Sequence, residues 1–355
     1  MRKLSNILVT GGAGFIGCNF IRFLLKKIDN FSGRIVNLDS LTYAGNLMSL
    51  DDIANDSRYI FERGDICNRA LVDSIFNKYN IDTVVHFAAE SHVDRSIHGP
   101  EEFIKTNVVG TFTLLDAARN AWKNKLDVLF HHISTDEVYG SLGETGLFTE
   151  TTAYDPHSPY SASKAGSDHL VMAYKHTYGI PVTLSNCSNN YGPFQFPEKL
   201  IPLMILNMLE KKPLPVYGDG KNIRDWLFVD DHNSAVWTIL KKGIPGESYN
   251  IGGDNEWENN KLLDMLINIT AEKAELNADD IRKTIIYVKD RPGHDRRYAI
   301  DCSKIKKELN WKQLVKFEEG LKRTVEWYLN NNSWVEFIRC GKYKQWIEKN
   351  YNKRN

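Results

Sequence analysis

Short apolar runs alternate with longer amphipathic stretches through the first half of the chain. Near-continuous apolar runs, which are typical of parallel strands buried on both faces, cover residues 6–10, 34–38, 59–61, 83–89, 126–133 and 181–187. Apolar residues at helical spacing follow the first run up to about residue 28 and recur over residues 107–122, and a further helix is expected from Tyr160. This alternation predicts an α/β fold, a Rossmann-type doubly wound parallel sheet with right-handed crossovers.

The pattern changes after about residue 190, where a segment rich in Pro, Gly and Asn leaves the predicted sheet. Helices are expected over residues 200–210 and 259–272. We predict a Rossmann-like domain over residues 1–190, which also takes in about 225–255, interleaved with a smaller mixed α/β C-terminal domain over residues 191–355. We interpret the aromatic residues of the tail as core and packing residues; they are Trp327, Tyr328, Trp334, Phe337 and Trp346.

A glycine turn joins the first predicted strand to the first helix. Gly12, Gly14 and Gly17 fit G-x-G-x-x-G, and Gly11 with the last two fits a looser spacing. Glycine is required where such a turn is tight and where backbone approaches a pyrophosphate. Asp39 ends the next strand about 20 residues later, where an acid suits a ribose 2′-hydroxyl and repels a 2′-phosphate. Together these features favour NAD over NADP, although a purely structural turn is the alternative for the glycines alone.

Residues capable of acid–base chemistry gather around a later strand end. Thr135, Asp136 and Glu137 follow a predicted buried strand, at the edge where open α/β sheets bind ligands. Tyr160 and Lys164 lie on one face of a predicted helix start. A lysine ammonium beside a phenol favours the phenolate, so a group with a pKa near 10 can act as a base nearer neutral pH. The carboxyls could serve as acid and base, although an Asp-Glu pair after a strand is by itself more often a solvated turn.

Two further segments carry ambiguous signals. The run over residues 290–297 places three arginines and His294 around a Pro-Gly turn. Such a run is typical of a solvated loop, but it could also hold a diphosphate. Asp65 follows another strand-like run and could lie near an adenine or cap a helix.

Charge and cysteine content exclude several classes of function. Lys+Arg and Asp+Glu both number 45, so no basic surplus indicates nucleic acid. No apolar run approaches the roughly 18 residues of a membrane span, and a strand pattern starts too early for a signal peptide. The 5 cysteines are scattered without C-x-x-C spacing, so neither a metal site nor a disulfide framework is expected. We expect a cytoplasmic protein with no nucleic-acid or membrane partner.

Six segments together resemble one known family. They are TGGAGFIG, STDEVYG, YSASK, NCSNNYGPFQFPEKLIP, IRDWLFVDDH and DRPGHDRRYAID. They resemble the dTDP-glucose 4,6-dehydratases, hydro-lyases of the extended short-chain dehydrogenase/reductase superfamily, and the match runs from about residue 5 to 330. The tail beyond is longer and more basic than the family pattern requires.

The resemblance implies a catalytic cycle with dTDP-glucose as substrate and tightly bound NAD as cofactor. Tyr160 would take the proton of the 4-hydroxyl while the C4 hydride passes to NAD+. Lys164 would hold the nicotinamide ribose and lower the tyrosine pKa, and Thr135 would hydrogen-bond the 4-oxygen. Glu137 would then remove the C5 proton, and Asp136 would protonate the departing 6-hydroxyl. Return of the hydride to C6 would give dTDP-4-keto-6-deoxy-glucose.

The resemblance also implies binding residues and a homodimer. Around NAD it places Gly11, Gly14, Phe15, Ile16, Gly17, Asp39, Thr42, Asp65, Ile66, Ala88, Thr106, Tyr160, Lys164 and Asn190. Around the sugar nucleotide it places Ser91, Thr135, Asn189, Lys199, Leu200, Pro215, Tyr217, Arg224, Asn259, Arg291 and His294. The alternative is an NAD-dependent nucleotide-sugar 4-epimerase or decarboxylase on the same scaffold, which would not need Asp136 as an acid. The choice between dTDP and UDP stays open.

Overall fold

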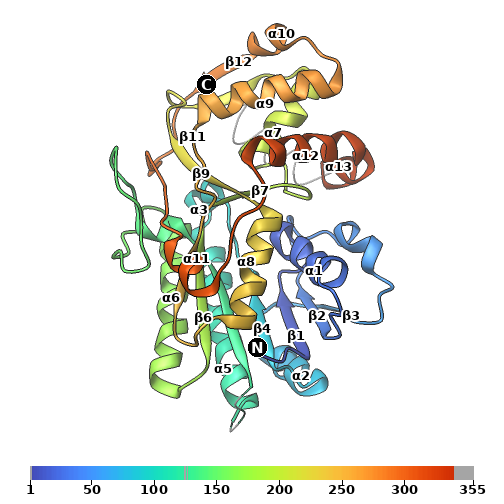
Figure 1. Ribbon diagram of the computed structural model, residues 1–355, viewed down its shortest axis with the longest axis vertical. Coiled ribbons are helices and arrows are strands. Elements are labelled where there is room, and N and C mark those ends of the chain that lie inside the picture. The colour runs from blue at the N-terminus through green and yellow to red at the C-terminus, as the bar shows by residue number, and fades with distance from the viewer. Residues whose placement is uncertain (1, 124, 126, 340–355) are drawn as a thin grey trace.

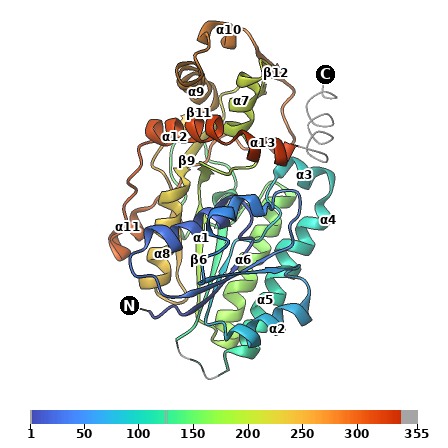
Figure 2. The same ribbon diagram turned by 90° about the vertical axis from the view of Figure 1, so that its right-hand side faces the viewer.

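A computed structural model describes residues 2–123, 125 and 127–339, and Figures 1 and 2 show its arrangement. Seven strands, all paired in parallel, form the large sheet in the order β10-β6-β5-β4-β1-β2-β3. They are β1 (Asn6–Thr10), β2 (Arg34–Asp39), β3 (Tyr59–Arg63), β4 (Thr83–His86), β5 (Leu129–Thr135), β6 (Val182–Cys187) and β10 (Ser248–Ile251). This is the doubly wound order extended by one strand, so the predicted fold class is confirmed.

Helices cover both faces of the large sheet. Alternate residues of a strand point to opposite faces, and in β1 Ile7 and Val9 belong to one apolar cluster while Leu8 belongs to another. On the first face lie α1 (Phe15–Lys27) and α8 (Val229–Lys242). On the second lie α2 (Arg69–Tyr79), α5 (Thr111–Ala121) and α6 (Pro159–Tyr178). Burial on both faces explains why the strands are near-continuously apolar.

The predicted boundaries differ from the observed ones at functional positions. β4 ends at His86 instead of residue 89, so the following residues form a loop at the sheet edge. β5 continues to Thr135, two residues beyond the prediction, and Leu126, its predicted start, lies outside the described residues. The helix expected from residue 107 begins earlier, as α3 (Val93–His98), α4 (Pro100–Phe103) and a π-helical segment, η2 (Ile104–Gly110), which leads into α5. Short helical turns also form η1 (Leu47–Ile53) and η3 (Asp136–Tyr139).

A smaller lobe stands above the large sheet at the top of Figure 1. Its sheets are β11-β9-β7 and the parallel pair β12-β8, formed by β7 (Asn189–Tyr191), β8 (Leu214–Tyr217), β9 (Ile223–Phe228), β11 (Glu256–Glu258) and β12 (Ile285–Val288). Its helices are α7 (Leu200–Leu209), α9 (Asn259–Ala274), α10 (Ala278–Arg282), α12 (Phe317–Asn330) and α13 (Asn332–Arg339). The mixed α/β character predicted for this region is therefore observed.

The chain passes between the two lobes more than once. After β9 it returns through α8 and β10 to the large sheet, and after β12 it returns again. Ile300 and α11 (Ser303–Leu309) pack in the apolar cluster that α1 and α8 form under the large sheet. The lobes are interleaved, which holds the loops between them in defined positions.

The tail aromatics have different environments. Trp327, Tyr328 and Trp334 pack edge-to-face, with the two tryptophan centroids 4.9 Å apart. Phe337 is 55% exposed, so it does not belong to the buried core, unlike Trp334, Val335 and Ile338 on the same helix. Trp346 lies outside the described residues. Within residues 2–339, as far as they are described, no helix has the length and apolar character that crossing a bilayer requires.

Candidate active site

A cavity of about 520 Å³ lies between the carboxyl edge of the large sheet and the smaller lobe. Its size is typical of a small-molecule site. Every residue predicted above to act in catalysis, to bind a dinucleotide or to bind a sugar nucleotide contributes to its lining. The structure therefore brings together segments that are as far apart as residues 11 and 294.

The glycine turn after β1 adopts the looser of the two predicted spacings. Gly11 has φ +71°, which favours glycine, and a Cβ there would lie 2.7 Å from the backbone of Ala88. A Cβ at Gly17 would lie 2.3 Å from the Gly11 carbonyl oxygen. Gly12 instead faces Asn37 and does not line the cavity. Close packing of turn, helix and neighbouring strand therefore explains the glycines at positions 11 and 17.

The N-terminus of α1 opens toward the cavity. Gly14 precedes the helix and has no capping side chain, so the first backbone N–H groups have no intrahelical partner. A Cβ at Gly14 would have only the Gly11 carbonyl oxygen within 4 Å, at 3.3 Å, so the space beside it is open. Unpaired N–H groups at a helix start attract anions such as phosphates.

Asp39 and Asp65 line the same end of the cavity. The buried Asp39 carboxylate accepts hydrogen bonds from the backbone N–H groups of Ala13 (2.9 Å) and Leu41 (2.8 Å). It thereby ties the glycine turn to the end of β2. Asp65 accepts from the Cys67 N–H at 2.8 Å, whereas Asn68 caps α2, so Asp65 is not the helix cap that was its alternative interpretation.

Asp136 and Glu137 are adjacent in sequence but differ in environment. Asp136 is 1% exposed, and burial together with the charges of Glu137 and Asp225 raises its pKa well above the ordinary value. Burial also raises the pKa of Glu137, but Arg291, Lys199 and Arg224 oppose that rise. The cations stabilise the ionised form of Glu137, and the carboxylates disfavour that of Asp136. The pair is therefore suited to one acid and one base.

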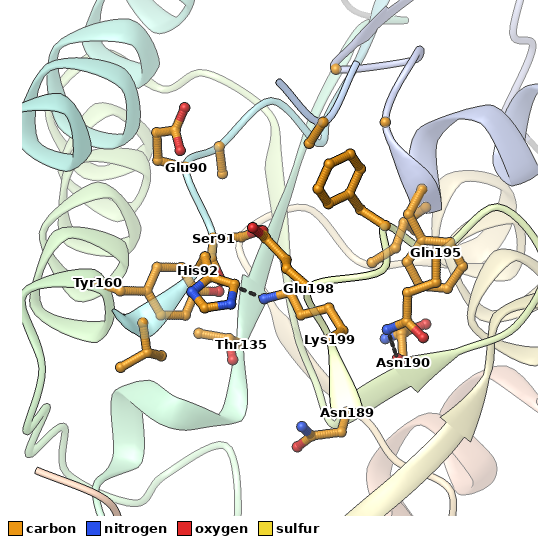
Figure 3. Close-up of a pocket in the computed structure, with 18 of the residues that line it drawn as sticks. Glu90, Ser91, His92, Thr135, Tyr160, Asn189, Asn190, Gln195, Glu198 and Lys199 are labelled. Atoms are coloured by element: carbon orange, nitrogen blue, oxygen red, sulfur yellow. Dashed lines mark hydrogen bonds between the residues drawn. The ribbon is translucent and has the colours of Figure 1, made fainter. Parts of the chain in front are cut away.

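Thr135 stands between these carboxyls and Tyr160. Its hydroxyl donates to Asp136 Oδ1 at 3.3 Å and accepts from the Glu137 N–H at 3.2 Å. Figure 3 shows the Tyr160 ring extending from its helix toward Thr135. A capping box formed by Ser158 and Ser161 starts α6 and places Tyr160 in its first turn.

Tyr160 and Lys164 are both buried, and the charges around the phenol differ from those around the ammonium. Burial, followed by the negative charge of Glu137, raises the pKa of Tyr160, and the hydrogen bond with Thr135 lowers it. The Lys164 Nζ donates to the Ile133 carbonyl oxygen at 2.7 Å, so the ammonium lies at the end of β5.

A buried polar network behind Lys164 was missed at the level of sequence. Its ammonium is 3.5 Å from His132 Nε2, which lies 3.1 Å from Asp168 Oδ1. Asp168 also accepts from Ser134 Oγ (2.6 Å) and the Tyr154 hydroxyl (3.0 Å), and burial raises its pKa to about 6. The spacing of Lys164 and Asp168, four residues apart on one helix, was the available signal.

Positively charged side chains line the wall of the cavity that faces the edge of the large sheet. Arg224 is buried over the Tyr298 ring, with its guanidinium carbon 4.2 Å from the ring centroid. Lys199 Nζ donates to the Ser91 carbonyl oxygen at 2.9 Å (Figure 3). Arg291 Nη1 is 3.8 Å from Asp94 Oδ1, while its buried Nε has no hydrogen-bond partner among the described residues.

Some side chains of the loop over residues 290–297 face the cavity, and others form ion pairs outside it. Arg291 and His294 line the cavity, and burial lowers the pKa of His294 to about 4. Arg296 and Arg297 point elsewhere and pair with Asp219 and Glu256. Only part of the arginine run therefore faces the site.

Residues around Glu198 are a second group that the sequence reading missed. Glu198 lines the cavity and accepts from Arg95 Nε at 2.9 Å and from the Tyr43 hydroxyl at 3.1 Å. Beside it, burial raises the pKa of Glu90 to about 7. Gln195 Nε2 donates to the Asn190 carbonyl oxygen at 2.9 Å (Figure 3). No short spacing marks these partners, since Tyr43 and Glu198 are 155 residues apart.

The Rossmann-type sheet, the glycine turn and the Tyr-Lys pair are together typical of the extended short-chain dehydrogenase/reductase superfamily. A family model described as GDP-mannose 4,6 dehydratase matches residues 8–324. The chain is 55% identical to a dTDP-glucose 4,6-dehydratase of Salmonella typhimurium, covering 98% of this chain and 99% of that protein. It is 54% identical to that of Neisseria meningitidis, covering 97% and 98%. The chain belongs to the dTDP-glucose 4,6-dehydratase family, so the resemblance noted from the sequence is confirmed.

Solved structures agree with this membership. The dTDP-glucose 4,6-dehydratase of Streptomyces venezuelae, determined with NAD and TYD bound, matches with a TM-score of 0.87 at 45% identity, covering 94% of this chain and 99% of that one. A UDP-glucose 4-epimerase of Thermotoga maritima matches with a TM-score of 0.82 at 29% identity, covering 92% and 99%. The fold is thus shared with this epimerase, and the sequence identity is higher with the dehydratase.

Proposed function

We propose that the protein is an NAD-dependent dTDP-glucose 4,6-dehydratase that converts dTDP-glucose to dTDP-4-keto-6-deoxy-glucose. The observation that carries this proposal is the contrast between Asp136 and Glu137. One carboxyl is buried beside like charges and the other faces three cations, at a strand end that also holds Thr135. Elimination of water needs an acid and a base in one site.

The residues at the glycine turn fit a dinucleotide. The open space beside Gly14 and the unpaired N–H groups of α1 would hold a pyrophosphate. Asp39 would accept from the adenosine ribose, and Ile66, Ala88 and Thr106 would line the slot. When bound, NAD supplies a hydride acceptor for C4 and later a hydride donor for C6.

The side chains at the sheet edge would then carry out the proton transfers of the reaction. Tyr160 takes the proton of the 4-hydroxyl, and Thr135 hydrogen-bonds the 4-oxygen. The resulting ketone acidifies the C5–H bond, from which Glu137 removes a proton. Asp136 is protonated because its pKa is raised, and it delivers that proton to the 6-hydroxyl as it leaves as water. Glu137 finally returns its proton to C5.

The cation-lined wall would bind the nucleoside diphosphate. Arg224, Arg291 and Lys199 supply positive charge there, and Arg291 has an unpaired buried donor nitrogen. Charge-assisted hydrogen bonds from guanidinium groups to phosphates are among the strongest in proteins. Ser91, Asn189, Leu200, Pro215, Tyr217, Asn259 and His294 complete this part of the lining.

Incubation with dTDP-glucose and, in parallel, with UDP-glucose tests the function. We expect a 4-keto-6-deoxy sugar from the dTDP substrate, identified by mass and NMR, and the two reactions report nucleotide preference. A 4-epimer or a decarboxylated product would favour the alternative activities on the same scaffold. The similarity to an epimerase at 29% identity supports that second candidate, but an epimerase does not need the buried acid Asp136.

We also propose a homodimer in the cytoplasm. Ile104, Val109 and Phe112 expose between 45% and 49% of their surface along η2 and α5, and Tyr178 on α6 exposes 49%. These neighbouring helices would form an apolar contact with a second copy. Light scattering should give twice the chain mass, Phe112→Asp should reduce it to one chain, and cell fractionation tests the location.

A further inference from the structure

Behind the wall of the cavity, a lysine and an aspartate lie one turn apart on the buried face of α6. Lys164 lines the cavity and is 4% exposed, and Asp168 follows four residues later and is 2% exposed. Residues at this spacing lie on the same face of a helix, with Cβ atoms about 5–6 Å apart. A buried charge is costly unless an opposite charge or hydrogen bonds compensate it. The proposed mechanism gives Asp168 no part in the chemistry, so a buried acid at this position has a different role.

Consecutive residues at the end of β5 hold both side chains. The Ile133 carbonyl oxygen accepts from Lys164 Nζ at 2.7 Å. Next along the strand, Ser134 Oγ donates to Asp168 Oδ2 at 2.6 Å, and the Tyr154 hydroxyl donates to the same oxygen at 3.0 Å. Donors that point at a carboxyl oxygen favour its ionised form. The strand end therefore fixes the lysine and the ionised aspartate in one arrangement.

An uncharged histidine stands between the two charged groups. His132 Nε2 lies 3.5 Å from Lys164 Nζ and 3.1 Å from Asp168 Oδ1. The ring is fully buried, and burial lowers the pKa of His132 well below its ordinary value. Asp168 Oδ1 has no hydrogen-bond partner among the described residues, so no donor on this side compensates its charge. The imidazole therefore separates a cation and an anion without adding a charge of its own.

Other titratable groups pack around this pair from several elements. They are His86 on β4, Cys187 on β6, Tyr139 in η3, Tyr154 before α6 and His169 on α6. Burial lowers the pKa of His86, raises that of Cys187 to about 12 and raises those of both tyrosines. Histidines are neutral in the alkaline range where a lysine titrates. Among the described groups, Asp168 therefore supplies the negative charge beside Lys164 at neutral and alkaline pH.

We propose that Asp168 is a positioning residue that keeps the Lys164 ammonium charged and fixed at the wall of the cavity. An ammonium has three donor hydrogens. Ile133 accepts one and His132 lies near a second, which leaves one for a ligand in the cavity. This inference rests on the proposed function, in which the cavity holds NAD, because a neutral lysine would be a weaker donor to that cofactor.

Asp168→Asn tests the proposal through the titration of Lys164, and Asp168→Glu, which keeps the charge, is the matched control. Labelling of the full chain with acetic anhydride over a pH series, followed by peptide mass spectrometry, reports the neutral fraction of each lysine. Burial lowers the pKa of Lys164, and the charge of Asp168 opposes that effect. We expect Asp168→Asn to lower the midpoint for Lys164 by about 1 to 2 pH units, as for the loss of a neighbouring opposite charge. Asp168→Glu should shift it less.

Lys199 is an internal standard in the same samples, because it also lines the cavity but lies on the facing lobe. Its midpoint should be the same in the original protein and in both variants. An unchanged midpoint for Lys164 in Asp168→Asn would overturn the proposal. Equal shifts of Lys164 and Lys199 would also overturn it, since they would indicate a general disturbance of the cavity.

Urea unfolding of a double-variant cycle provides a second measurement that needs no turnover. Lys164→Met leaves Asp168 buried without its cation, and Asp168→Asn leaves Lys164 without its anion. Removing one member of a buried pair is more destabilising than removing both. The double variant should therefore be at least as stable as Asp168→Asn, whereas additive losses would contradict the pairing. Should Asp168→Asn fail to fold, a folded double variant would support the pairing, and failure of both would contradict it.

The pH dependence of turnover links the pair to the proposed function. With dTDP-glucose as substrate, the alkaline limb of the kcat profile should move to lower pH in Asp168→Asn, by the same amount as the labelling midpoint. A limb that stays in place while the midpoint moves would show that the charge of Lys164 does not limit turnover, which would overturn its role beside the cofactor. Failure of the unaltered protein to form product would instead refute the proposed function, and the labelling result would still stand.

Discussion

The two walls of the cavity are built in different ways. On the large sheet, functional residues stand at strand ends or in the first turn of a helix: Gly11 follows β1, Asp39 ends β2, Thr135 ends β5 and Tyr160 begins α6. On the facing lobe, side chains are positioned by contacts with residues remote in sequence. Arg224 donates to the Asp295 carbonyl oxygen 71 residues away, and Lys199 donates to that of Ser91, 108 residues away.

The two walls of the cavity are therefore suited to different tasks, proton transfer at the sheet edge and binding on the facing lobe. The sheet edge has fixed backbone positions, which proton transfer requires because reacting atoms must lie within hydrogen-bond reach. The facing lobe contributes mainly positive charge, which binds a diphosphate without such strict geometry. Substitutions at the edge should therefore change kcat, and substitutions on the lobe should change KM.

Tyr160→Phe should have the largest effect. We expect kcat to fall by about 10⁴, at the upper end for a lost general base, with dTDP-glucose binding unchanged. The ring packs edge-to-face on Phe103 with centroids 6.3 Å apart, and removing the hydroxyl keeps that contact. Initial rates and calorimetric titration would measure both quantities. A variant that turns over within tenfold of the original would remove Tyr160 from the mechanism.

Asp136→Asn should lower kcat by about 10² to 10³, because water loss then lacks its acid. Oxidation at C4 does not use this carboxyl, so the absorbance of NADH should persist in the variant. Glu137→Gln is the matched comparison: it should abolish deuterium exchange at C5, which Asp136→Asn should retain. Identical behaviour of the two variants would mean that the contrast between the carboxyls has no catalytic role.

Arg291→Gln should raise KM by about 10- to 100-fold, the equivalent of losing one hydrogen bond to a charged group. Its kcat should stay within about threefold if the lobe serves binding. Arg296→Gln is the control, since Arg296 belongs to the same loop but forms an exposed ion pair with Asp219 outside the cavity. Equal changes in the two variants would indicate a general disturbance of the loop.

His157→Gln should have the smallest effect of these substitutions. It removes a contact between the two walls of the cavity and should change stability. His157 precedes α6, and its Nδ1 is 2.5 Å from Asp295 Oδ1 in the loop of the facing lobe. The hydrogen bond to Asp295, with a smaller contribution from Asp155, raises the pKa of His157. A raised pKa contributes stability that is complete below the unfolded value near 6.5 and is lost as pH rises through the folded value.

The side chain of His157 is 40% exposed, so we expect a loss below about 1 kcal/mol. Urea unfolding at about pH 5.5 and about pH 8.5, on either side of the ordinary histidine pKa, would measure it. The difference between variant and original should shrink at the higher pH. A difference that grows with pH would show that the pair does not stabilise the charged histidine.

Local patterns in the sequence were sufficient for the large sheet and for the residues at its edge. Apolar runs, a glycine turn and a Pro-Ser helix start act over a few residues, so strands, turn and first helical positions follow from them. An error arose where tertiary contacts set the end of a strand, since β4 ends early beside the glycine turn.

The sequence by itself determined the order of strands and helices, the dinucleotide turn and the identity of the acid, base and tyrosine candidates, because each depends on neighbours in the chain. Only the tertiary structure decided how the environments of the two adjacent carboxyls differ and which arginines face the cavity. Burial and cations contributed by remote segments set those properties. The same holds for the network of His132 and Asp168 and for Glu198 with Tyr43 and Arg95, whose partners meet only after the two lobes pack together.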